Sequence, residues 1–156
     1  MSDAQAALVV FAPVPGRVVR MADVPDPVFA ASLVGPGAAV DPIRSRHRAV
    51  APVDGRIVKL HPHAFVVVTP DGRGVLVHLG IDTVQLKGEG FTLLAAEGDE
   101  VATGAPVVEW DPAAVEAGGR SPLCPVVALE GKAESVTGLV EPGAVVRAGD
   151  PLFEWA

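Results

Sequence analysis

Apolar residues in this chain gather in short runs, and glycine, proline or aspartate separates one run from the next. Short runs of Val, Ile and Phe between such residues are typical of β-strands. One longer pattern differs: Pro112 opens an alanine-rich stretch that Gly118 and Gly119 close, which predicts a helix. A short helical turn is expected within 27–34 and a polar loop at 41–48. Strands are predicted at 8–13, 16–21, 49–53, 55–60, 63–69, 74–79, 106–110, 124–129 and 152–155.

Two internal repeats indicate how these strands are organised. The segment 12–20, with a Pro-Val-x-Gly turn between two apolar runs, is echoed by 51–59. Near the C-terminus, the Gly, Val, Pro, Glu and Trp positions of 98–110 recur at 143–155. The repeats predict two similar β halves that pack face to face. The expected fold is all-β, a compact antiparallel sandwich or barrel resembling a duplicated hybrid motif, with one or two short helical segments.

Size and composition narrow the function classes. The 156 residues, 49% hydrophobic, suit one domain spanning 1–156, in which residues 1–7 are expected to form a disordered tail. A net charge of −7 argues against nucleic-acid binding and suits docking to a basic protein. The single cysteine, Cys124, excludes an intramolecular disulfide framework. The start of the chain lacks a basic signal-peptide region, and no apolar run reaches the roughly 20 residues of a membrane span. A cytoplasmic protein that does not span the membrane is expected.

Two histidines mark the ends of neighbouring apolar runs. His63 opens the run 63–68, and His78 ends the run 74–77. A hairpin turning near 70–72 would bring both to one end, although the register that decides whether their rings share a face is not fixed by sequence. His61 adds a His-x-His spacing, which suits zinc if a third ligand is present. His47, in an arginine-rich segment, is interpreted as a solvated surface residue.

The string from His78 to Phe91, HLGIDTVQLKGEGF, together with His63-Ala64-Phe65 and the upstream segment 23–26, resembles the glucose-class enzyme IIA of the bacterial phosphoenolpyruvate–sugar phosphotransferase system. The similarity extends from about Val10 to Glu154. It implies that His78 is the phosphorylated nucleophile and that His63 is its companion, which stabilises the phosphoryl group. It also implies that the phosphocarrier HPr is the donor, that a cysteine of a sugar-specific IIB domain is the acceptor, and that some members bind regulatory protein targets.

Supporting roles are expected around these two rings. Backbone N–H groups near Gly80 could bind phosphoryl oxygens, and Asp26 and Asp82 could meet arginines of the donor at the rim. No cofactor is required, although His63 and His78 could hold zinc. An apolar docking surface is predicted from Phe29, Leu33, Val34, Leu76 and Val84, several of which could instead be ordinary core.

One departure from the resemblance concerns His61. Many members carry a threonine two residues before the companion histidine, and its hydroxyl can orient that ring. Here His61 stands at that position and Pro62 follows it. The orienting bond is therefore lost, made by imidazole, or replaced by a metal site.

Three other functions compete with the phosphocarrier. A zinc hydrolase of the lysostaphin type would use His61, His63, His78 and Asp82, although their order along the chain is reversed relative to those enzymes. A biotinyl or lipoyl carrier would need a lysine at a hairpin tip, and no lysine here has that context. A non-catalytic partner-binding protein would keep the apolar rim without a labile phosphate.

Overall fold

Fourteen β-strands and a few short helical segments form the fold of residues 6–156, the part of the chain that this computed structural model describes. Every strand pairing is antiparallel. The strands are β1 (Leu8–Phe11), β2 (Gly16–Arg20), β3 (Gly37–Pro42), β4 (His47–Val50), β5 (Gly55–His61), β6 (Ala64–Val68), β7 (Gly74–His78), β8 (Phe91–Leu93), β9 (Glu100–Val101), β10 (Pro106–Trp110), β11 (Cys124–Ala128), β12 (Val136–Gly138), β13 (Val145–Val146) and β14 (Pro151–Trp155). The helical segments are η1 (Met21–Asp23), α1 (Pro27–Ala30), η2 (Thr83–Leu86), α2 (Pro112–Ala117) and η3 (Ala133–Ser135).

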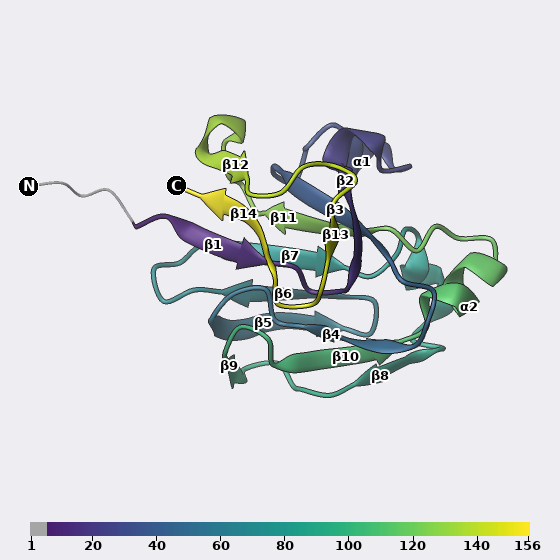
Figure 1. Cartoon of the computed structure of the whole chain (residues 1–156). Helices are drawn as coiled ribbons and strands as arrows, with labels where there is room; N and C mark the ends of the chain where they lie inside the picture. Colours follow the sequence, from purple (N-terminus) through teal and green to yellow (C-terminus); the bar gives the residue numbers. More distant parts are fainter. Residues whose placement is uncertain (1–5) are drawn as a thin grey trace, which may run out of the picture.

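The strands form one large and two small sheets, and their order shows the duplication. The eight-stranded sheet runs β13-β2-β3-β11-β7-β6-β5-β9, and the small sheets run β1-β14-β12 and β4-β10-β8. In each small sheet a strand that precedes a Pro-Val-x-Gly turn, β1 or β4, pairs with a strand from the second repeat, β14 or β10, so the two small sheets are counterparts (Figure 1). The large sheet has the same duplication about its central strands, β11 and β7: β3, β2 and β13 on one side correspond to β6, β5 and β9 on the other. The predicted all-β, duplicated antiparallel fold is confirmed.

Nine predicted strands are present with small shifts at their ends, and both helical predictions are confirmed. Asp26 and Asp111 cap α1 and α2, because each side chain accepts hydrogen bonds from two backbone N–H groups of the helix it precedes. The predicted loop at 41–48 is wrong at both ends. Residues 41–42 belong to β3, which pairs with β2 and β11, and β4 begins at His47 and pairs with β10. Polar side chains on one face do not prevent strand formation when the backbone has partners on the neighbouring strands.

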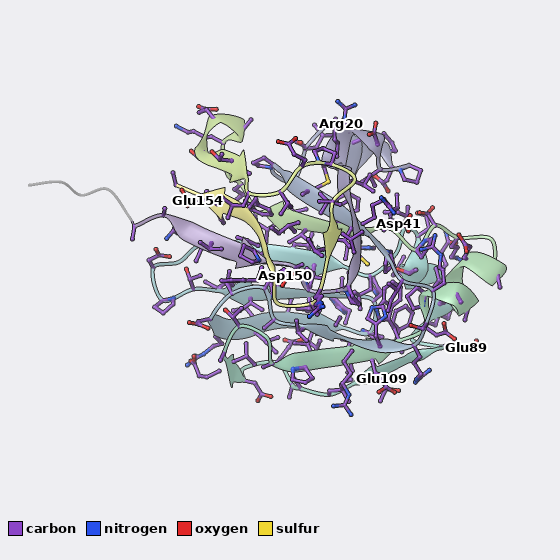
Figure 2. All side chains as sticks on the ribbon, viewed as in Figure 1. Arg20, Asp41, Glu89, Glu109, Asp150 and Glu154 are labelled. Atoms are coloured by element: carbon purple, nitrogen blue, oxygen red, sulfur yellow. The ribbon has the colours of Figure 1, made fainter. Side chains whose placement is uncertain are left out.

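The interior between the sheets holds the main core, to which Phe65, Trp110 and Phe153 contribute the largest fully buried side chains (Figure 2). A smaller apolar cluster lies on the outer side of the large sheet, beneath η1 and α1, and consists of Met21, Val24, Ala39, Ile81 and Val127. This outer cluster seats α1 beside the centre of the large sheet. The placement of α1 matters because Phe29, within it, reaches His78.

The interpretation of His47 as a solvated residue is wrong. Its ring is half-buried, its Nε2 accepts a hydrogen bond from Nε1 of Trp110 at 3.1 Å, and its Nδ1 lies 2.8 Å from the carbonyl oxygen of Ser45. The neighbouring residues Arg46 and Arg48 are exposed and contact Glu109, which projects outward below β10 (Figure 2). A segment that is polar in sequence therefore has one inward-facing histidine among outward-facing charges.

The first described strand pairs with the last, so Leu8 in β1 lies opposite Trp155 in β14 (Figure 1). Of the predicted N-terminal tail, residues 1–5 lie outside the described residues, whereas Ala6 and Ala7 are exposed and lead into β1. Arg73 donates hydrogen bonds to the carbonyl oxygens of Ala6 and Trp155, each at 2.8 Å. Within the described chain, no helix is long and apolar enough to cross a membrane.

Candidate active site

The β6–β7 hairpin brings the two predicted histidines together. Its turn closes at Thr69 and Arg73, and its register pairs Ala64 with His78, so that the N–H of Leu79 donates to the carbonyl oxygen of His63 at 2.7 Å. The predicted hairpin pairing is confirmed. The rings of His63 and His78 meet edge to face, with centroids 5.2 Å apart. His78 is the last residue of β7, and this end of the strand points toward α2 (Figure 1).

A backbone carbonyl fixes the protonation of the His78 ring. Nδ1 of His78 lies 2.5 Å from the carbonyl oxygen of Gly80. Because a carbonyl only accepts, Nδ1 carries the proton in this contact and Nε2 keeps a free lone pair. Burial lowers the pKa of His78, an effect that the Gly80 carbonyl, Asp26 and Asp82 oppose. The ring is therefore neutral at neutral pH and presents a nucleophilic Nε2.

The turn that follows β7 holds the Gly80 carbonyl in place. Gly80 has a φ of +84°, and a Cβ at this position would lie 2.6 Å from Cγ2 of Thr83. The hydroxyl of Thr83, which is fully buried, donates to the carbonyl oxygen of Leu79 at 2.7 Å. The N–H of Ile81 donates to the carbonyl oxygen of Ser121 at 2.8 Å. Only glycine fits this close approach, so the sequence His-Leu-Gly positions the carbonyl that orients His78.

His63 lies in the two-residue turn between β5 and β6, not on a strand as predicted. Its pKa is lowered to about 4, first by burial and then by the neighbouring His78 and His61 rings. In the part of the chain that the structure describes, no protein group hydrogen-bonds the His63 ring. His63 is thus a neutral imidazole with a free N–H that can donate to an oxyanion beside His78.

The other supporting residues surround these rings. His61 is exposed, and its ring stacks on that of His63 with a centroid separation of 5.6 Å and an interplanar angle of 21°. Asp26 and Asp82 lie near enough to His78 to raise its pKa electrostatically. Asp82 is exposed and has a left-handed backbone with a φ of 60°. The acidic groups therefore lie at the rim of the site, where a partner can reach Asp82.

The predicted docking residues fall into two groups. Leu33 and Val84 are 72% and 59% exposed, which suits contact with another protein. Phe29, Val34 and Leu76 are half-buried and pack against the outer cluster beneath α1, so they serve partly as core. The ring of Phe29 also meets that of His78 edge to face at 5.3 Å.

Sequence reasoning missed two contributors to this region. Thr83 supports the turn that orients His78, and nothing in its polar side chain distinguishes it from the surface residues around it. Val28 is 44% exposed on α1 and extends the apolar rim beside Phe29. An exposed apolar residue within a short capped helix is the signal that could have identified Val28.

No metal centre is evident among residues 6–156, where no group of three or more His, Cys, Asp or Glu side chains is arranged to hold a metal ion. The rings of His61, His63 and His78 form a row of ring contacts. A hydrolytic zinc centre usually has three protein ligands. The zinc-hydrolase alternative is not supported.

Comparison with known proteins agrees with this geometry. Residues 8–134 match the family model of the phosphoenolpyruvate-dependent sugar phosphotransferase system, EIIA 1. The glucose-specific EIIA component of Haemophilus influenzae is 42% identical over 145 residues, covering 92% of this chain and 85% of that protein. The N-acetylglucosamine-specific EIICBA component of Klebsiella pneumoniae is 40% identical over 144 residues, which are 91% of this chain and 22% of that longer protein.

A solved structure has the same fold. The glucose permease IIA from Mycoplasma capricolum superposes with a TM-score of 0.84 at 31% identity, and the match covers 99% of both chains. The agreement thus covers the whole fold, including both small sheets and the hairpin of the two histidines. This chain belongs to the EIIA 1 family of the phosphoenolpyruvate-dependent sugar phosphotransferase system.

Proposed function

We propose that this chain is a phosphocarrier of the sugar phosphotransferase system, and that Nε2 of His78 carries the phosphoryl group. The observation that supports this most directly is the contact between Nδ1 of His78 and the Gly80 carbonyl, which leaves Nε2 unprotonated. A neutral imidazole nitrogen is a competent nucleophile toward phosphorus. The lowered pKa of His78 keeps this form dominant at neutral pH.

The reaction proceeds in two balanced steps. The lone pair of Nε2 attacks the phosphorus of a donor phosphohistidine, an N–P bond forms at His78, and the donor nitrogen recovers the electron pair of the bond that breaks. In the second step an acceptor thiolate attacks the same phosphorus and the electron pair returns to Nε2. Phosphoryl transfer depends mainly on alignment and on stabilisation of oxygen charge. The N–H of His63 supplies part of that stabilisation.

The proposed partners are HPr as donor and a cysteine of a sugar-specific IIB domain as acceptor, with regulatory proteins as further targets. Leu33 and Val84 offer exposed apolar contact area beside the site. Asp82 and Asp26 add negative charge at its rim, which complements a basic donor surface. The exchange takes place in the cytoplasm and, in this proposal, requires no cofactor.

The test is phosphorylation of the intact chain by phosphoenolpyruvate, enzyme I and HPr. We expect one acid-labile phosphate, absent from the His78→Gln variant. The His63→Gln variant should accept phosphate but pass it to a IIB domain slowly. Stoichiometric labelling of the His78→Gln variant would refute the assignment.

A further inference from the structure

A β-bulge determines where the side chain of His61 points. The register of β5 on β6 shifts between Ile57 and Lys59, which face Val67 and Val66, so Val58 is an extra residue in β5. Ile57 is fully buried, and strict alternation from it would point residues 59 and 61 inward as well. The extra residue reverses that alternation: Leu60 is buried, whereas Lys59 and His61 are exposed.

The same register places His61 level with the phosphoryl-accepting residue. His61 pairs with Ala64, and Ala64 pairs with His78, so these three residues form one row across β5, β6 and β7. Residues directly opposite one another on paired strands share a face of the sheet. The bulge therefore brings His61 to the face on which His78 lies.

His63 depends on its neighbouring rings for orientation. No protein hydrogen bond to its ring is found among the described residues, and its ring contacts are the stack with His61 and the edge-to-face contact with His78. The edge-to-face contact involves the ring that is to receive the phosphoryl group, whereas the stack with His61 does not involve His78.

We propose that His61 is a positioning residue, which holds the His63 ring by stacking so that its N–H faces the phosphoryl group on His78. The inference rests on the proposed function of His78 and deepens it. His61 touches neither the phosphoryl group nor His78; it acts through His63. Stacking thus does the work that a hydrogen bond to the companion ring would otherwise do.

Two variants of His61 distinguish the effect of ring stacking on His63 from the electrostatic effect of the imidazole. His61→Phe keeps a flat ring against His63 and removes the ring nitrogens, whereas His61→Ala removes the ring. The electrostatic effect of His61 also lowers the pKa of His63, so the pKa of His63 should rise in both variants. Transfer from phosphorylated chain to IIB should slow about 2- to 12-fold in His61→Ala, the range that aromatic pair energies set, and stay near wild type in His61→Phe. The loss should appear in the maximal rate rather than in the IIB concentration at half-saturation.

A second readout does not depend on phosphoryl transfer. Side-chain NMR relaxation should show an ordered His63 ring in the wild type and in His61→Phe, and a mobile ring in His61→Ala. Arg56→Ala, an exposed substitution on β5 before the bulge, is the matched control and should leave both readouts unchanged. If the wild type accepts no phosphate yet the ring loses order in His61→Ala, the proposed function fails, whereas the ordering of the His63 ring by His61 stands. An ordered ring in His61→Ala, or equal loss of transfer in both His61 variants, overturns the inference.

Discussion

Replacing Gly80 with alanine should damage both the stability of the fold and the acceptance of phosphate. Alanine at a φ of +84° has an unfavourable left-handed backbone, which costs about 1–2 kcal/mol. The added Cβ would also lie 2.6 Å from Cγ2 of Thr83 and 3.1 Å from the carbonyl oxygen of Ser121. Relief of such crowding in a packed site costs about 1–3 kcal/mol more. Because the Gly80 carbonyl holds Nδ1 of His78, any shift of the turn also weakens the preference for a free Nε2.

Gly72 offers a matched control for this experiment. Its φ is +89°, but a Cβ there would meet nothing within 4 Å, and it lies in the turn at the far end of the β6–β7 hairpin. Urea unfolding should therefore show a loss of about 1–2 kcal/mol for Gly72→Ala and a larger loss for Gly80→Ala. The initial rate of phosphorylation by phospho-HPr should fall only in Gly80→Ala. Equal stability and equal rates in the two variants would refute the role assigned to the Gly80 carbonyl.

Four further outcomes are expected. Stability should decrease as the pH falls from 6.5 toward 4, because the pKa of His63 is about 4 in the folded chain and the unfolded chain takes up the proton first. Solvent screens this partly exposed ring, so the loss should be well below the roughly 3 kcal/mol of the full shift, and a profile unchanged by His63→Gln would contradict it. His47→Phe should cost about 1–3 kcal/mol in urea unfolding because Nε1 of Trp110 loses its acceptor, and wild-type stability would argue against that bond. Asp26→Ala should cost about 0.5–2 kcal/mol through loss of the α1 cap and lower the pKa of His78 in an NMR titration; a rise in that pKa would contradict the electrostatics. Removal of divalent metal by a chelator should leave phosphate acceptance by His78 unchanged, and restoration of a lost activity by zinc would show that metal is required.

The sequence predicted what depends on local patterns. The hairpin that joins His63 and His78 follows from two apolar runs and a Pro-Asp-Gly turn, and its pairing is as expected. The strands that the sequence did not predict are β3, β8, β9, β12 and β13, and none is joined to its strand partners by a tight hairpin turn. β9 and β13 have only two residues each, and β3 is rich in small residues, so none carries a strong apolar pattern of its own.

The site was harder to predict where it depends on register. The bulge in β5 decides that His61 faces outward, and its trace in the sequence is slight: the buried apolar residues Ile57 and Leu60 stand three positions apart instead of two. His47 looked like a surface residue because arginines flank it, and only its pairing with Trp110 shows its inward position. The division of the predicted docking residues into exposed and half-buried ones likewise follows from how α1 packs on the large sheet, which no local pattern encodes.

The pairing of β1 with β14 has a consequence for how the chain folds during synthesis. β6 and β7 are neighbours in sequence, so the hairpin of the two histidines can form soon after its residues leave the ribosome. β1 emerges before the hairpin, but its only strand partner among the described residues is β14, about 140 residues further along the chain. Until β14 has emerged, β1 therefore has an unpaired edge that can bind other chains. A message truncated before residue 151 should yield a protein that contains the complete histidine hairpin and yet aggregates.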